Sequence, residues 1–129
     1  MEVLTSRLLL RPIDFDRSIA FYRDTLALGI YREFGEGGVG GVVFFIGGGL
    51  LEVSGSAPGG ERPSESLRLW FQVRDVDATH AELQAAGVSI QRPPRNEPWG
   101  LREMWIADPD GIQIAIIQVP EDHPLRRRI

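Results

Sequence analysis

The sequence contains no cysteine and no lysine, and only two of its 129 residues are histidine. The absence of cysteine excludes disulfides, thiolate zinc sites, iron–sulfur clusters and cysteine nucleophiles. The absence of lysine excludes a lysine Schiff base and a lysine general base. The 14 basic residues are all arginines, whose guanidinium groups prefer planar, bidentate partners.

Long apolar runs and an excess of positive charge are also lacking. No run approaches the roughly 20 apolar residues of a membrane-spanning helix, and Met1–Leu10 lacks the pattern of a signal peptide. We therefore expect a cytoplasmic protein. The net charge of −4 argues against non-specific binding to nucleic acids or to anionic membranes.

The chain contains an internal repeat, in which an apolar run precedes an Asp-x-Asp motif and then a helical pattern. Leu8–Leu10 precedes Asp14–Asp16, and Leu69–Val73 precedes Asp75–Asp77. The first aspartate of each motif is a good N-cap, because its side chain can accept hydrogen bonds from free backbone N–H groups. The repeat predicts two copies of a strand, a capped helix and further strands.

Apolar spacing and turn residues place the other elements. The expected apolar stripes are Phe15, Ile19, Tyr22 and Leu26 before a stop at Gly29, and Val76, Leu83 and Ala86 before a stop at Gly87. The expected strands are 42–46, 50–53, 101–107 and 112–119, with turns at 47–49 and 108–111. A linker is expected over 54–64, a frayed tail over 121–129, and either a mobile lid or a plain flexible loop over Gly35–Gly41.

These motifs together carry a family resemblance. The motifs are Asp14–Tyr22, Phe71–Ala78, Pro98–Gly100, Arg102–Glu103 and Asp108–Gly111. In this order they resemble the vicinal-oxygen-chelate superfamily of glyoxalases, bleomycin-resistance proteins and dioxygenases, and most closely its metal-free bleomycin-resistance-like members. The resemblance implies an α+β fold in one domain, 1–129, of two βαβββ modules (about 1–56 and 65–120). It also implies a curved mixed sheet that forms a cup, and a homodimer.

In enzymatic members of that superfamily, histidine or glutamate side chains at four strand positions hold a metal ion. Counting from the helix-entry motifs, these positions fall on Arg7, Glu52, Arg68 and Ala115. Only Glu52 can bind a metal, because arginine has no free lone pair and alanine has no donor atom. A stable divalent site usually needs three or more protein ligands, so we expect no metal and no other cofactor.

The resemblance places Arg7, Glu52 and Arg68 in the same cup. The two guanidinium groups could replace the metal's positive charge and bind a ligand carboxylate or phosphate. Alternatively, the three side chains could form a structural ion-pair cluster. Glu52 is also a weak candidate for a general base, because ion pairs with the arginines would occupy it.

Tryptophans provide further candidate ligand contacts. Strand alternation places Arg68 and Trp70 on one face, and Trp105 and Glu103 share a face of a later strand. Flat aromatic side chains stack on planar or cationic ligands, although they also fill cores and interfaces. The full set of candidate ligand-binding residues is Arg7, Glu52, Arg68, Trp70, Trp99, Arg102, Glu103 and Trp105.

The sequence favours binding over catalysis. The leading hypothesis is a metal-free protein that sequesters an aromatic or charged small molecule in a cleft at a dimer interface, as bleomycin-resistance proteins do. The alternative is a metal-dependent enzyme of the glyoxalase or dioxygenase type, and a metal-free lyase or isomerase using Glu52 ranks last. The expected partners are a small molecule and a second copy of the chain, with no nucleic acid and no membrane.

Overall fold

The computed structural model describes residues 1–36, 40–55 and 65–125. It divides into two compact units, Met1–Pro63 and Ser64–Ile129, and each unit is described by itself. The expected linker lies mostly outside the described residues, as do the middle of the glycine-rich loop and the last four residues of the tail.

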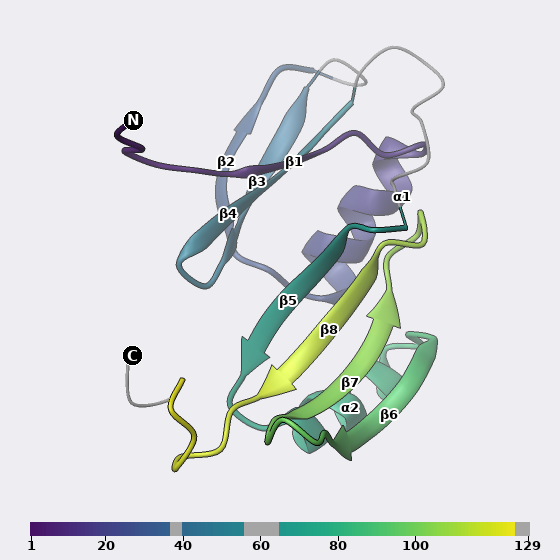
Figure 1. Ribbon diagram of the computed structural model, residues 1–129. Coiled ribbons are helices and arrows are strands. Elements are labelled where there is room, and N and C mark those ends of the chain that lie inside the picture. Colours follow the sequence, from purple (N-terminus) through teal and green to yellow (C-terminus); the bar gives the residue numbers. More distant parts are fainter. Residues whose placement is uncertain (37–39, 56–64, 126–129) are drawn as a thin grey trace. The chain divides into compact units, whose positions relative to one another are not determined.

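The first unit has the order strand, helix, three strands (Figure 1). Its elements are β1 (Leu8–Leu10), α1 (Phe15–Ala20), the π-helical segment η1 (Phe21–Thr25), β2 (Ile30–Phe34), β3 (Gly41–Ile46) and β4 (Gly49–Ser54). The sheet order is β1-β4-β3-β2. Strand β1 runs parallel to β4, and the other neighbours are antiparallel.

The second unit repeats this plan. Its elements are β5 (Arg68–Val73), α2 (Val76–Ala85), β6 (Ile90–Asn96), β7 (Arg102–Ala107) and β8 (Gln113–Gln118), with sheet order β5-β8-β7-β6. Strand β5 is parallel to β8, as β1 is to β4. The α+β class and the two βαβββ modules are therefore confirmed. The expected mixed sheet is present as two four-stranded sheets.

The predicted aspartate caps begin both main helices. The Asp14 Oδ1 accepts a hydrogen bond of 3.1 Å from the Arg17 backbone N–H, and the Asp75 Oδ1 accepts one of 3.0 Å from Ala78. Each bond satisfies a backbone donor that the helix itself leaves free. The sequence signal for helix entry is thus confirmed in both modules.

The helix ends follow the prediction only in the second unit. Gly87 has a φ of +80° directly after α2, as a glycine stop requires. After η1, however, the left-handed residue is Ala27 with a φ of 54° rather than Gly29. The π-helical segment ends at Thr25, and beyond it the Leu28 N–H bonds to the Tyr22 carbonyl at 3.0 Å.

One face of each sheet packs against the helix of its own unit. In the first unit the rings of Tyr22 and Phe44 lie 6.1 Å apart, and Leu51 beside Phe44 is fully buried. In the second, α2 packs against β6, β7 and β8, and buries Val76 and Leu83. The third residue of its expected stripe, Ala86, is exposed, because the helix ends there.

Two strands have no counterpart in the sequence-based prediction. These are β2 and β6, the edge strands of their sheets. Strand β6 contains Pro93 and Pro94, which usually argue against a strand. An edge position tolerates them because one side of the strand needs no hydrogen-bond partners, and its pairing with β7 is irregular between Arg92 and Arg95.

In the part of the chain that the structure describes, no helix is long and apolar enough to cross a membrane.

Candidate functional site

The register of the two sheets makes the four candidate metal positions equivalent in pairs. Leu9 lies opposite Glu52 in the parallel pair β1 and β4, and Trp70 lies opposite Ala115 in the parallel pair β5 and β8. Arg7 stands two residues before Leu9, and Arg68 stands two residues before Trp70. Arg7 is therefore related to Glu52 in the first unit as Arg68 is to Ala115 in the second.

In the first unit the two side chains form an ion pair. The Arg7 Nη1 donates to the Glu52 Oε1 at 2.9 Å, and the side chains are 34 % and 17 % exposed. The predicted proximity of Arg7 and Glu52 is thus present in the structure. The pair neutralises the only carboxylate among the four positions.

These residues do not fit a divalent metal ion. One oxygen of Glu52 is already bound by a guanidinium, and the other three side chains are two arginines and an alanine. Divalent sites need several neutral or anionic donors. Within the described ranges no group of three or more histidine, aspartate or glutamate side chains is close enough to hold an ion.

On the sheet face away from α2, the second unit presents a row of four side chains that includes two tryptophans and an arginine. Trp70 on β5 lies opposite Ala115 on β8, which lies opposite Trp105 on β7, which in turn lies opposite Arg92 on β6. Gln118 of β8 points to the helix side, because its Oε1 accepts a hydrogen bond from the Val76 N–H at 3.0 Å. Ala115 lies three residues before Gln118 on the same strand, so it points to the opposite face. Trp70 is 51 % exposed.

Two tryptophans of this face share one buried carboxylate. The Trp99 Nε1 donates to the Glu103 Oε2 at 2.7 Å, and the Trp105 Nε1 makes a longer contact of 3.5 Å with Oε1. Glu103 is 7 % exposed, whereas Trp99 is 57 % exposed. The structure therefore brings together three of the predicted residues, and it holds Trp99 in place while leaving much of its ring accessible.

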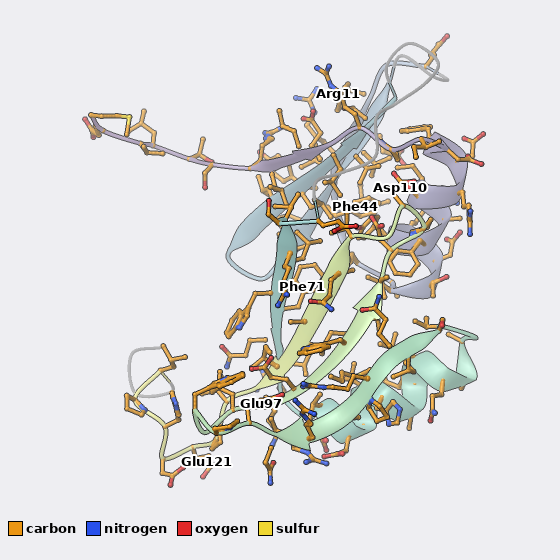
Figure 2. All side chains as sticks on the ribbon, turned by 45° about the vertical axis from the view of Figure 1, so that its right-hand side comes forward. Arg11, Phe44, Phe71, Glu97, Asp110 and Glu121 are labelled. Carbon is orange, nitrogen blue, oxygen red and sulfur yellow. The ribbon has the colours of Figure 1, made fainter. Side chains whose placement is uncertain are left out.

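Arg92 completes this cluster and was missed by the sequence analysis. Its guanidinium lies 3.6 Å from the centre of the Trp105 ring, and its Nη2 donates to Glu97 and to the Glu103 carbonyl. Glu97 is buried at the end of the β6–β7 hairpin (Figure 2) and also accepts from Arg95 at 3.3 Å. The Nε and Nη1 of Arg92 are buried without a hydrogen-bond partner.

The hairpin that carries Trp99 is closed from both sides. Within it, the Glu97 N–H bonds to the Leu101 carbonyl at 2.8 Å, and Gly100 has a φ of +92° that favours glycine. From outside, the His123 Nε2 lies 3.3 Å from the Trp99 carbonyl oxygen. Within the described part of the expected frayed tail, His123 thus contacts the hairpin, whereas Glu121, Asp122 and Leu125 are exposed.

Arg102 lies on the other face of the second sheet. Its Nε and Nη2 donate to both carboxylate oxygens of Asp77 in α2, at 3.0 and 2.9 Å. These hydrogen bonds lower the pKa of Asp77 and raise that of Arg102. Arg102 therefore fastens α2 to β7 and does not join the tryptophan cluster, because neighbouring strand residues point to opposite faces.

Arg68 is exposed at the start of β5. Among the described residues it makes no hydrogen bond and no ion pair, in contrast to Arg7 at the equivalent place. The structure thus places predicted residues in an ion pair in the first unit and in a tryptophan–carboxylate cluster in the second, while Arg68 has no partner among the described residues. The charged residues around Pro93 and Pro94, among them Arg92 and Glu97, are visible in the sequence. The two prolines argue against a strand there, so the sequence does not place these charges on the sheet.

Comparison with known proteins identifies the family. A family model described as "Glyoxalase/Bleomycin resistance protein/Dioxygenase superfamily" matches residues 5–116. The uncharacterized protein YraH of Bacillus subtilis (strain 168) is 31 % identical over 131 residues, covering 92 % of this chain and 99 % of YraH.

Solved structures share the fold. A member of the same superfamily from Sphaerobacter thermophilus matches with a TM-score of 0.74 and 21 % identity, over 91 % of this chain and 98 % of that one. Lactoylglutathione lyase from Agrobacterium tumefaciens matches with a TM-score of 0.68 and 19 % identity, over 92 % and 94 %. The chain belongs to the glyoxalase/bleomycin resistance protein/dioxygenase superfamily.

Proposed function

We propose that this protein is a metal-free member of its superfamily that binds and sequesters an aromatic or charged small molecule, as bleomycin-resistance proteins do. The observation that carries the proposal is the state of Glu52. It is the only metal-binding side chain among the four positions, and Arg7 occupies one of its oxygens at 2.9 Å. Since a divalent ion usually needs three protein ligands or more, the chemistry left to this fold is recognition by arginines and tryptophans.

The proposed ligand contacts lie on the exposed parts of the second sheet. Trp70 and Trp99 offer accessible aromatic surface, and the bond from Trp99 to Glu103 fixes one ring before any ligand arrives. A fixed side chain loses less conformational entropy on binding, so pre-organisation increases affinity. We also propose that two copies of the chain pair and complete the cleft, and that the protein acts in the cytoplasm.

Metal analysis of the untagged protein, purified from metal-supplemented medium, tests the metal-free state. We expect much less than one divalent ion per chain, at the level of a control protein that binds no metal. About one tightly held ion per chain would overturn the proposal and would favour a metal-dependent enzyme of the glyoxalase or dioxygenase type.

A thermal-shift screen of aromatic natural products then tests binding directly. A ligand at about 100 times its Kd should stabilise the protein by about 2.7 kcal/mol. Light scattering during size-exclusion chromatography measures the mass against the 14.4 kDa of one chain and so tests the dimer. Cell fractionation tests the location.

A further inference from the structure

The two units of the repeat differ at one pair of equivalent positions. The first unit has an arginine and a carboxylate there, whereas the second has an arginine and an alanine. In the first unit, the guanidinium two residues before Leu9 binds the carboxylate of Glu52. In the second unit, Arg68 holds the same position before Trp70, but the residue opposite Trp70 is Ala115, which has no carboxylate. The backbone register is the same in both units, and the second unit has no acid at the position of Glu52.

From this difference we infer that Arg68 and Trp70 bind an aromatic carboxylate, whose carboxylate takes the place that Glu52 fills in the first unit. This inference rests on the proposed function and names its ligand class. The distance of 2.9 Å between Arg7 and Glu52 shows that an arginine at this position reaches a carboxylate anchored above the opposite strand.

The neighbouring side chains suit the aromatic part of such a ligand. Ala115 stands opposite Trp70 on one side and opposite Trp105 on the other, so the short alanine is flanked by two indole side chains. Trp70 is half exposed and makes no aromatic pair with another described ring, which leaves its face free for stacking. Offset or edge-to-face stacking contributes about 0.5–1.5 kcal/mol beyond the buried area.

The charges on this face also permit an anion. Glu103 lies two residues from Trp105 on this face, and its two oxygens contact the indole N–H groups of Trp99 and Trp105. The guanidinium of Arg92 lies over the adjoining Trp105 ring. Arg68 itself is exposed and has no ion-pair partner among the described residues.

Isothermal titration calorimetry of the full chain with 2-naphthoate, and with the neutral 2-naphthamide as its match, tests the inference. Since hydrogen bonds to charged groups contribute about 1.5–3 kcal/mol, the unmodified protein should bind the naphthoate roughly tenfold tighter or more. Arg68→Gln should remove this preference by weakening naphthoate binding to the level of the amide. Arg74→Gln removes another exposed arginine of the same unit and should change neither affinity.

A second variant tests whether Arg68 and position 115 are equivalent to Arg7 and Glu52. Ala115→Glu should place a carboxylate opposite Trp70, where it pairs with Arg68 as Glu52 pairs with Arg7, and so should weaken naphthoate binding roughly tenfold. Far-UV circular dichroism checks that the variant folds. If it does not fold, the Arg68→Gln and Arg74→Gln pair still decides the question.

The failure of this inference is distinct from a failure of the proposed function. Equal binding of the two probes, or naphthoate binding that Arg68→Gln leaves unchanged, overturns the inference while small-molecule binding stands. Absence of naphthoate binding at millimolar concentration also overturns the inference. The proposed function fails on a separate measurement, the finding of one tightly held metal ion per chain.

Discussion

The bond between Trp99 and Glu103 should contribute measurably to the stability of the second unit. Glu103 is buried and its Oε2 accepts from the Trp99 indole at 2.7 Å, whereas the contact from Trp105 is 3.5 Å long. Hydrogen bonds to a charged group contribute about 1.5–3 kcal/mol, and a buried acceptor left without its donor incurs a desolvation penalty of similar size. Trp99→Phe should therefore lower the free energy of unfolding by about 1–3 kcal/mol.

Glu103→Gln probes the same bond from the acceptor side. The amide keeps the shape of the carboxylate but loses its charge, and one of its two polar atoms becomes a donor that faces an indole N–H. We expect a loss of about 1–3 kcal/mol here too. In the double variant the two losses should overlap, giving an interaction energy of at least about 0.5 kcal/mol.

Urea denaturation followed by far-UV circular dichroism measures all three variants without relying on tryptophan fluorescence. Trp70→Phe is the matched control, because Trp70 is half exposed and donates no described hydrogen bond. It should change the unfolding free energy by less than about 0.5 kcal/mol. The reasoning is refuted if the effects of Trp99→Phe and Glu103→Gln simply add, or if both stay within the range of the control.

Three other measurements follow from the structure. The pKa of Asp77 is lowered from its ordinary value of 3.8, first by the hydrogen bond from Arg102, so this carboxylate stabilises the fold above pH 3.8 and the contribution is lost as pH falls through the lower folded-state value. Asp77→Asn should thus be less stable than the unmodified protein near neutral pH, and the gap should narrow in urea titrations below pH 3.8; a gap independent of pH contradicts the assignment. Met104→Ala empties a fully buried core position and should cost about 2–5 kcal/mol in the same urea assay, with a loss under 1 kcal/mol as the contrary result. Gly87→Ala places a side chain at a φ of +80° with open space around it, so backbone strain alone should cost about 1 kcal/mol, and an unchanged midpoint would show that the turn adjusts freely.

The helices and central strands could be predicted because their signals are local. Asp14 and Asp75 each cap a helix through one side-chain bond, and such a bond depends only on the three following residues. The edge strand β6 could not be predicted, because Pro93 and Pro94 argue against a strand unless its place at the sheet edge is already known. That place is a property of the whole sheet.

The candidate site was predictable to the extent that the family resemblance fixes strand positions. It identified Arg7 and Glu52, which the structure joins in an ion pair. The resemblance also placed Arg102 with the ligand contacts. Arg102 precedes Glu103 by one residue along β7, so its side chain points to the opposite face and binds Asp77 on the helix side. Arg92 was missed because its role depends on the Trp105 ring across the strand pair, a contact between residues of two different strands.

The two units of this chain share a register yet differ in chemistry. Hydrogen bonding fixes the pairing of β1 with β4 and of β5 with β8, so a side chain can change without moving its neighbours. The first unit has an acid opposite Leu9 that pairs with Arg7, so the two charges of this pair neutralise each other. The second has alanine opposite Trp70 and, within the described ranges, an arginine without an ion-pair partner, so ligand selection should depend on its side chains more than on those of the first. Substituting Arg68 should therefore change which ligands bind, whereas substituting Arg7 together with Glu52 by neutral residues of similar size should leave that preference intact.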